Sequence, residues 1–432
     1  MSKRNLDETD EVRVEERDRK RLKSPHPGFL AASATSTSPS QAIQPVLELP
    51  YAAKDAKRAA SAVPFQLPTQ LISFSYTPDR VLEFNDSSLR YFVDPPRGAQ
   101  LSYGYDRWVR RPEERGRLDS LLKAWQKFGT ERPGVLGEVG VVSWRGVMTK
   151  ILTAPYEERD DWELNVMLVG GTMYFEEHLS EEKLQSKNDV EPRHRIQMYY
   201  GYSFESWCTS ESPSPASHSG NPSQPTSDGH PPGWGGDVNT NVQWCSVVKT
   251  KLGNTRMVIG GEVDCVRGRY TGKTDNFVEL KTSLTIRGAS DEARFEKKLI
   301  KFYFQSFLLG VPEITVGFRT PSGVLSTVQS FRTIEIPRLV RGKPGAWDPT
   351  LCLEWGDRFI RELRDAIDVH SPPDKRNDGN LSDLPVWRVS FSPKVGITVK
   401  QLDDAGIMDV EAGDDEQRIG FLPKWYVEYA LD

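Results

Sequence analysis

The chain has 432 residues, and its 56 Lys and Arg against 61 Asp and Glu give a formal net charge of −5, which predicts no particular partner. Hydrophobic residues at 37% and aromatic residues at 10% are typical of a globular protein and exclude collagen-like and membrane-spanning classes. Because the N-terminus is charged and no apolar run approaches about 18 residues, we expect an intracellular protein without a membrane partner.

The four cysteines and six histidines offer little to a metal or a catalytic site. Cys208, Cys245, Cys265 and Cys352 are widely spaced, form no C-x-x-C pair and have no neighbouring histidine. No H-E-x-x-H spacing occurs either. We therefore expect reduced cysteines in the core, and neither a zinc site nor histidine-based catalysis.

Two polar segments predict disorder around one catalytic domain, residues 51–432. Residues 1–50 form a predicted tail, because they combine charge blocks with a Ser/Thr/Ala/Pro stretch that has few apolar groups. Its basic run RKRLK, residues 19–23, is either a nuclear-import address or a solvated charge run. Residues 210–237 are rich in Pro, Gly and Ser and predict a disordered surface insertion.

Apolar periodicity predicts the elements of the domain. Short alternating runs predict strands, and apolar residues three and four apart predict helices. In chain order, the predicted strands are 139–144, 164–169, 173–175, 244–248, 257–266, 277–281, 314–318 and 324–336, followed by a hairpin-like pair in 386–399. Helical spacing is mixed in 195–208 and clear in 291–309 and 352–369. The fold class is α/β, a single mixed-sheet domain flanked by helices.

Four charged residues fall on two neighbouring predicted strands. In VIGGEVDCV, Glu262 and Asp264 share one strand face, because successive side chains alternate. The following strand contains VELKT, which places Glu279 and Lys281 on one face. Two adjacent strands would then present three carboxylates and one ammonium group together.

Crowded carboxylates stay ionised only if a cation offsets their repulsion. Oxygen ligands favour a hard divalent ion, Mg²⁺ or Mn²⁺, and one or two such ions serve phosphodiester hydrolysis. Lys281 would orient or deprotonate the attacking water, or neutralise developing charge. The alternative for either pair alone is the solvent face of an amphipathic strand.

The helix that follows carries Lys298, Lys301 and Gln305 at spacings of three and four, so they form one stripe that can face the sheet edge. A solvated helix face is the alternative for the two lysines. It is weaker for Gln305, which lies among large apolar residues, because a buried amide needs partners. Acid-x-acid, then Glu-x-Lys, then a helix with a polar residue is the order seen in PD-(D/E)XK nucleases.

The sequence resembles the DXO-like decapping nucleases, whose fungal branch partners the nuclear 5′-to-3′ exoribonuclease. The resemblance runs from about Val142 to Tyr429 and is carried by an ordered set of motifs. They are SWRGVMTKILTAPYE, MYYGYSFESWC, DVNTNVQWCSVVKTKLG, GGEVDCV, VELKTS, FQSFLLGVPEITVGFRTPSG and FLPKWYVEY.

The resemblance implies a role for each matching position. Its metal-binding set is Glu205, Glu262, Asp264, Glu279 and the backbone carbonyl of Leu280. Lys281 and Gln305 would be the catalytic polar pair at the scissile phosphate, acting with Glu262 and Asp264, and Arg145 would contact substrate. The roles of Glu205 and Arg145 rest on the resemblance alone, since the residues by themselves indicate surface ion pairs.

The resemblance also implies a function. Such enzymes remove pyrophosphate, incomplete or unmethylated guanosine caps and NAD caps from RNA 5′ ends in the nucleus, leaving a 5′ monophosphate. Trp144, Tyr202 and Trp207 would either stack on bases or pack in the core. One alternative function is a mainly non-catalytic scaffold subunit of the exoribonuclease. Another is a DNA-processing nuclease with the same kind of metal site.

Overall fold

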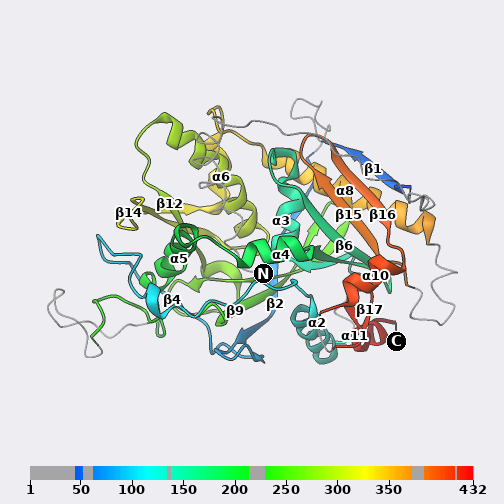
Figure 1. The fold of residues 1–432 in the computed structure, drawn as a ribbon, viewed down its shortest axis with the longest axis horizontal. Helices are drawn as coiled ribbons and strands as arrows, with labels where there is room; N and C mark the ends of the chain where they lie inside the picture. Colours follow the sequence, from blue (N-terminus) through cyan, green and yellow to red (C-terminus); the bar gives the residue numbers. More distant parts are fainter. Residues whose placement is uncertain are drawn as a thin grey trace, which may run out of the picture.

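The computed structural model describes residues 44–51, 62–133, 138–213, 229–371, 384–413 and 416–431. Its strands form two mixed sheets and a short hairpin (Figure 1). The ten-stranded sheet has the order β1 (Leu47–Pro50), β16 (Gly396–Gln401), β15 (Trp387–Ser392), β6 (Trp162–Val169), β7 (Thr172–His178), β5 (Val141–Trp144), β10 (Thr255–Glu262), β9 (Gln243–Leu252), β2 (Phe65–Tyr76) and β3 (Leu82–Glu83). The six-stranded sheet has the order β14 (Leu325–Arg332), β13 (Glu313–Arg319), β12 (Phe277–Leu284), β11 (Cys265–Val266), β4 (Tyr91–Phe92) and β8 (Thr209–Ser210). The hairpin pairs β17 (Arg418–Ile419) with β18 (Leu422–Pro423).

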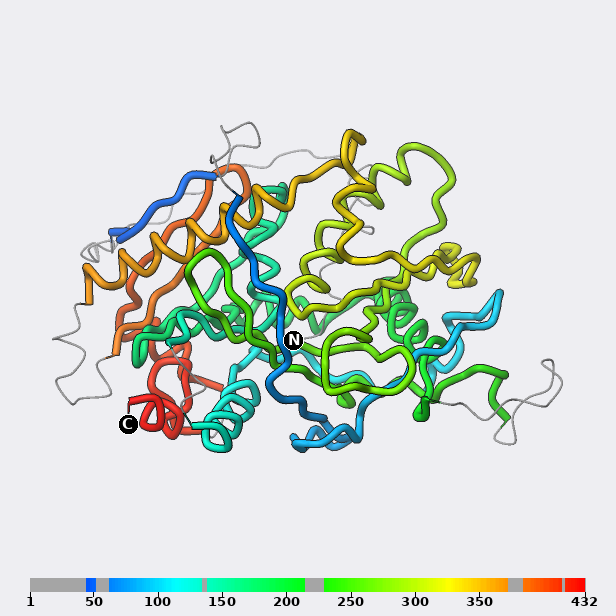
Figure 2. The backbone as a smooth tube through the Cα atoms, turned by 180° about the vertical axis from the view of Figure 1, so that it is seen from behind, coloured from blue at the N-terminus to red at the C-terminus, as the bar shows by residue number. Residues whose placement is uncertain are grey.

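Helices surround both sheets. They are α2 (Asp119–Glu131), α3 (Arg145–Thr153), α4 (Glu181–Asn188), α5 (Pro192–Trp207), α6 (Ala289–Phe307), α7 (Ile336–Val340), α8 (Pro349–His370), α10 (Asp404–Glu411) and α11 (Lys424–Leu431). Short 3₁₀ helices cover Tyr105–Arg107, Ala154–Tyr156, Thr274–Asn276 and Thr333–Glu335. In the rear view, β1 lies along β16 at the edge of the larger sheet (Figure 2). These findings confirm the predicted α/β class, with strands divided over two sheets.

The ten-stranded sheet is buried on both faces. Val141 and Ile259 pack in one core with residues of α3 and α8, whereas Val142 and Val258 pack in a second core with residues of α2 and α11. Since successive side chains of a strand alternate, each of these apolar runs supplies both cores. The long apolar strands of the sequence are therefore central strands between two helical layers.

The six-stranded sheet lies between α6 and α5. Phe277 of β12 packs in the core that contains α6, while Val278 and Leu280 pack in a third core with α5. The same alternation places Glu279 and Lys281 on the α6 side of the sheet. This arrangement brings the Glu-x-Lys motif toward the helix that carries Gln305.

The two predicted helices 291–309 and 352–369 are confirmed as α6 and α8, and favourable residues lie at both starts. Asp291 and Glu292 lie in the first turn of α6, where the helix dipole favours acids. The Asp348 side chain caps α8 by accepting a hydrogen bond from the backbone N–H of Thr350, and Pro349 occupies the first position. Both helices bury an apolar stripe.

Most predicted strands are confirmed, and two are wrong at their ends. The strand predicted at 257–266 ends at Glu262, and β11 begins only at Cys265 in the other sheet. The strand predicted at 324–336 ends at Arg332, where a 3₁₀ helix and α7 begin. In the first case the chain changes sheets and in the second it turns into helix, while the apolar pattern continues, so local periodicity does not register either end.

The two segments predicted to be disordered are partly ordered. Leu47–Pro50, placed in the tail, forms β1 and pairs with β16. Part of 210–237 also packs: Trp234 contacts the ring of Trp207, and Asp237 binds Arg107 at 2.7 Å. Residues 1–43 and 214–228 lie outside the described residues. The prediction of disorder is therefore wrong for these described parts of the two segments.

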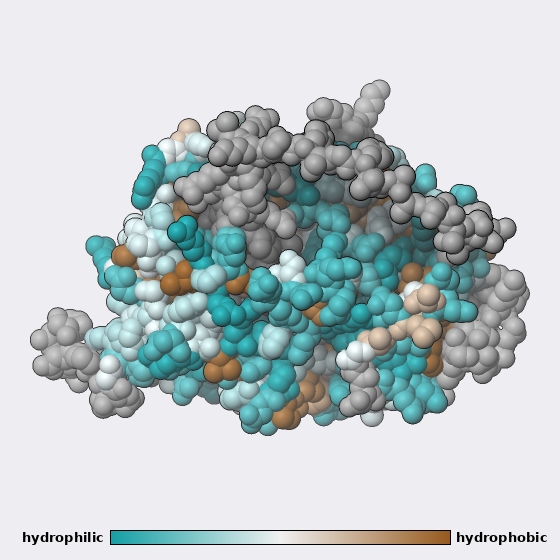
Figure 3. All heavy atoms as spheres, in the orientation of Figure 1, coloured by the Kyte–Doolittle hydropathy of each residue, from teal (hydrophilic) through white to brown (hydrophobic). Residues whose placement is uncertain are grey.

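The surface and the cysteines are unremarkable. The face drawn in Figure 3 is mostly hydrophilic, with hydrophobic residues scattered over it. No helix in the described part of the chain has both the length and the apolar composition that crossing a bilayer requires. All four cysteines are free and buried, as predicted.

Gly317 of β13 fixes how closely α5 approaches the smaller sheet. A Cβ at this position would lie 2.5 Å from Cε2 of Phe204, a side chain with no exposed surface. We expect Gly317→Ala to lower the free energy of unfolding by about 1 to 3 kcal/mol, because the ring has to move in a packed core. Urea denaturation measures the effect. Gly288→Ala is the control, since a Cβ there meets no atom within 4 Å; equal losses in the two variants would contradict the packing argument.

Glu176 on β7 makes stability depend on pH. Burial raises the pKa of its carboxyl to about 8, against the opposing effect of Arg117 and Arg418, while nearby Asp119 adds to the rise. The native state therefore holds this proton more tightly than the unfolded chain. Its stabilising contribution is complete below the unfolded pKa, about 4.5, and is lost as pH rises through 8. We expect the melting temperature of wild type to fall relative to Glu176→Gln between pH 5 and 9; parallel profiles would contradict this.

Candidate active site

Five of the predicted site residues line one pocket of about 580 Å³. Glu205, Glu262 and Asp264 line it together with Arg145 and Gln305. These five side chains come from α5, the end of β10, the connection to β11, the start of α3 and the last turns of α6. The structure thus brings together residues that are up to 160 positions apart in the sequence.

Glu262 and Asp264 lie where the chain passes from the larger sheet to the smaller one. Glu262 ends β10 and accepts a hydrogen bond from Nε2 of Gln243 at 3.1 Å. Asp264 lies beyond the strand, and its Oδ2 accepts a hydrogen bond from the backbone N–H of Leu280 at 2.7 Å. The predicted single strand face was therefore wrong, yet the two carboxylates do line the same pocket.

Glu279 is fully buried and lies between two cations. Its Oε2 accepts a hydrogen bond from Nη1 of Arg145 at 2.9 Å, and its Oε1 lies 3.1 Å from Nζ of Lys281. All three side chains are at most 6% exposed, so their charges interact with little screening by water. Arg145 is a buried ion-pair partner, whereas the residues alone had indicated a surface pair. Glu279 and Lys281 are not among the residues that line the pocket.

Lys298, Lys301 and Gln305 were predicted to form one polar stripe on α6, and of these three residues Gln305 lines the pocket. It is 3% exposed, and its Oε1 has no hydrogen-bond partner among the described residues. Its backbone carbonyl lies 3.4 Å from Nη1 of Arg145. Lys301 instead forms an ion pair with Glu157 at 3.5 Å, so the three residues do not act as one stripe at the site.

Two glycines before Glu262 allow α3 to start against β10. A Cβ on Gly261 would lie 2.8 Å from Leu309 and 3.1 Å from Cβ of Arg145. A side chain here would push Arg145 away from Glu279, because real Cβ atoms do not approach so closely. The GGEVD motif therefore combines the carboxylates with the close packing that places their cationic neighbour.

Helix α5 contributes one wall of the pocket. Tyr202 and Glu205 are three residues apart, so they lie on the same helix face, and both line the pocket. Trp144 also lines it, and its Nε1 donates a hydrogen bond to the carbonyl of Arg117 at 2.9 Å. Trp207 is 3% exposed and packs in the core. Of the two roles expected for this residue, stacking on bases and packing in the core, the structure shows the second.

The donor set fits a hard divalent cation, although the carboxylates are engaged with protein groups. No group of three or more His, Cys, Asp or Glu side chains in the described ranges is already arranged to hold a metal ion. Three carboxylates nevertheless line the pocket, and the oxygen of Gln305 adds a buried acceptor without a hydrogen bond. Oxygen donors of this kind suit Mg²⁺, Mn²⁺ or Ca²⁺ rather than a soft metal.

Many basic side chains line the pocket, and they were not predicted from the sequence. They come from several segments: Arg80, Arg90, Arg110, Arg111, Arg115, Arg117, Lys123, Lys150 and Lys187. The acidic net charge gave no indication of them, because a local cluster does not depend on the total. The run RWVRRPEERGR, residues 107–117, was the available signal, since it combines arginines with an aromatic residue. Such a lining suits a polyanionic ligand.

Comparison with known proteins agrees with this geometry. The family described as RAI1 like PD-(D/E)XK nuclease matches residues 66–427. The chain is 38% identical to "Decapping nuclease RAI1" of Mycosarcoma maydis, over 84% of this chain and 87% of that one. It is 32% identical to "Decapping and exoribonuclease protein" of Bos taurus, over 84% and 85% of the two chains.

A solved structure shares the fold over most of its length. Candida albicans Rai1, in complex with pU5 and Mn²⁺, superposes with a TM-score of 0.72 at 25% identity and covers 89% of this chain and 99% of that one. The family match, residues 66–427, covers every pocket residue named above. It also covers the strands of both sheets except β1 and the first residue of β2. This chain belongs to the RAI1-like family of PD-(D/E)XK nucleases.

Proposed function

We propose that this protein is a metal-dependent hydrolase that removes pyrophosphate, incomplete guanosine caps and NAD caps from RNA 5′ ends and leaves a 5′ monophosphate. The observation that carries the proposal is the convergence of Glu205, Glu262 and Asp264 with Gln305 on one pocket that has a basic lining. Carboxylates at the centre suit a cation, and the surrounding arginines and lysines suit RNA phosphates.

In this proposal Glu205, Glu262 and Asp264 would hold the cation at the pocket. The carbonyl of Leu280 and Glu279, whose oxygens face Arg145 and Lys281, would be the further ligands. Mg²⁺ or Mn²⁺, as one or two ions, would polarise the scissile phosphate and lower the pKa of a bound water. The chain's own polar groups orient the reactants. The amide of Gln305 lies at the pocket surface and can hydrogen-bond the phosphate or the water.

Lys281 and Arg145 supply positive charge behind the carboxylates. Both contact Glu279, so they fix the position of that carboxylate and offset its charge. Lys281 has a further contact, since its Nζ lies 5.8 Å above the ring of Phe302 on α6. Its proposed role is to stabilise the charge that develops at the scissile phosphate.

The names of the relatives support the RNA substrate. Two of them are called decapping enzymes, and the Candida albicans structure holds pU5 with Mn²⁺. The test is product analysis of 5′-labelled RNAs that bear a triphosphate, an unmethylated cap, a methylated cap or an NAD cap. We expect pyrophosphate or intact cap to be released with Mg²⁺ or Mn²⁺ and no release with a chelator. Wild type that leaves every end intact while stimulating a 5′-to-3′ exoribonuclease would favour the scaffold function.

We also propose a nuclear location and a nuclear 5′-to-3′ exoribonuclease as partner. The basic run at residues 19–23 and the resemblance to the fungal branch support both. A fluorescent fusion of the full chain should enter the nucleus. Replacing Lys20, Arg21 and Lys23 by alanine should leave it in the cytoplasm; unchanged nuclear signal would contradict an import role for the run. Co-purification with the exoribonuclease tests the partner.

A further inference from the structure

One side of the pocket is formed by a stretch without helix or strand. This wall segment, residues 110–118, supplies a series of lining side chains between the bridge at Val109 and the start of α2. Two of its backbone N–H groups donate to side chains, that of Arg111 to Thr240 and that of Glu113 to Asn188. Because no sheet ladder or helix fixes the segment, its position depends on such individual contacts.

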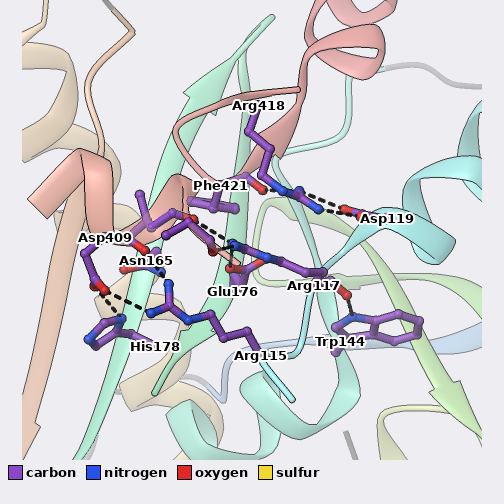
Figure 4. A network of polar contacts seen from close by, with 12 residues as sticks. Arg115, Arg117, Asp119, Trp144, Asn165, Glu176, His178, Asp409, Arg418 and Phe421 are labelled. Atoms are coloured by element: carbon purple, nitrogen blue, oxygen red, sulfur yellow. Dashed lines mark hydrogen bonds and ion pairs between the residues drawn. The ribbon is translucent and has the colours of Figure 1, made fainter. Parts of the chain in front are cut away.

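Arg117 makes the most extensive of these contacts. Its Nη1 donates to Oε1 of Glu176 at 3.0 Å and to the carbonyl of Val410 at 2.8 Å, and its Nη2 donates to the carbonyl of Ala412 at 2.8 Å. The Arg117 side chain is only 12% exposed, although the residue lines the pocket. Its guanidinium is therefore directed toward Glu176 and the end of α10 (Figure 4).

Arg115 and Asp119, which lie on either side of Arg117, also bind this part of the chain. We call it the C-terminal segment, residues 404–413 and 416–423. Arg115 donates to the backbone carbonyl of Asp409 and, at 2.9 Å, to its Oδ1. Asp119 accepts two hydrogen bonds from Arg418, at 3.1 and 2.7 Å. Arg418 is 1% exposed and also donates to the carbonyl of Phe421. Figure 4 shows these pairs side by side between the wall segment and the C-terminal segment.

The same residues connect to the catalytic groups. The carbonyl of Arg117 accepts the hydrogen bond from Nε1 of Trp144 at 2.9 Å. Trp144 ends β5, and the next residue is Arg145, which binds the buried Glu279. A displacement of Arg117 would therefore move the wall segment and release the indole that precedes Arg145.

We propose that the C-terminal segment holds the wall of the RNA pocket in place and that Arg117 is the positioning residue of this contact. The inference rests on the proposed function, because it assigns the wall segment to RNA binding. The planar guanidinium suits the task, since its N–H groups reach three acceptors in fixed directions. A lysine at this position keeps the charge but concentrates its donors on one nitrogen, so it cannot span the carboxyl group of Glu176 and both carbonyls.

A direct phosphate contact by Arg117 is the competing role, and it makes a different prediction. A group that binds RNA through charge would tolerate lysine and would leave the free protein unchanged when it is replaced. A positioning residue would not tolerate lysine, and its loss would loosen residues 110–118 before any RNA is bound. The free protein therefore separates the two roles.

The experiment compares wild type, Arg117→Lys, Asp119→Asn and the control Arg361→Lys, which alters the ion pair of the exposed Arg361 with Asp357 on α8. Hydrogen–deuterium exchange of the amides of residues 110–118 is measured in the free full-length protein, and KM and kcat are measured on triphosphorylated RNA. We expect faster exchange and a KM raised about tenfold in Arg117→Lys and Asp119→Asn, with kcat changed less than threefold, and wild-type values for the control.

A raised KM with unchanged exchange would overturn the proposal in favour of direct RNA contact, and unchanged KM and exchange would overturn it outright. If Arg117→Lys does not fold, Asp119→Asn carries the same comparison. Wild type that is inactive on every RNA end would refute the proposed function instead, while the exchange measurement would still decide whether the C-terminal segment holds the wall.

Discussion

Asp264→Asn is expected to reduce kcat/KM for RNA 5′-end hydrolysis by at least about 10³-fold, equivalent to about 4 kcal/mol of transition-state stabilisation. Asparagine keeps an oxygen that can accept the 2.7 Å hydrogen bond from the N–H of Leu280, so the local backbone should be preserved. The substitution removes the negative charge that the pocket offers to a divalent cation. Glu262→Gln should behave in the same way.

Two measurements separate lost chemistry from lost folding. Thermal unfolding of both variants should stay close to that of wild type, while titration with Mn²⁺ should show weaker binding. Glu428→Gln is a matched control, because this exposed carboxylate pairs only loosely with Lys424, at 3.9 Å, on α11. Wild-type rates in both pocket variants would show that hydrolysis does not need these two carboxylates, and would contradict the proposed metal site in this pocket.

Arg145→Met is expected to lower the free energy of unfolding by about 3 to 5 kcal/mol, because it removes one cation from a fully buried carboxylate. Glu279 would keep the contact of Lys281 with Oε1 but would lose the hydrogen bond of Arg145 to Oε2. Urea denaturation in the presence of a chelator measures this effect without a contribution from bound metal.

A double-mutant cycle tests whether the cost arises from the pair. Glu279→Gln in the Arg145→Met background removes the uncompensated charge, so the double variant should lose less than the sum of the single variants, by about 0.5 to 3 kcal/mol. Additive losses would mean that Arg145 stabilises the fold through packing of its stem, for example against Gly261, and not through Glu279.

Local sequence alone determined much of this protein. Alternation in runs such as Val258–Ile259 identified strands that are buried on both faces, and the apolar stripe of α6 identified its helix. The order of the E-x-D, E-x-K and Gln motifs predicted a PD-(D/E)XK nuclease, and the longer set of motifs carried the resemblance to the family that the comparison shows. These features are readable because side-chain periodicity and motif spacing are properties of consecutive residues.

Only the tertiary structure decided how the site is held. In the folded chain β10 ends at Glu262, and Asp264 lies just before β11 of the second sheet, where it binds the N–H of Leu280. Arg145 is buried against Glu279. The fold also joins Arg117 to carbonyls at the C-terminal end of the chain, nearly 300 residues away. These contacts join residues that are distant in the chain, and each depends on which surfaces pack together. Local propensity therefore predicts the elements and their motifs, whereas the packing of the two sheets and the C-terminal segment determines the arrangement of the pocket.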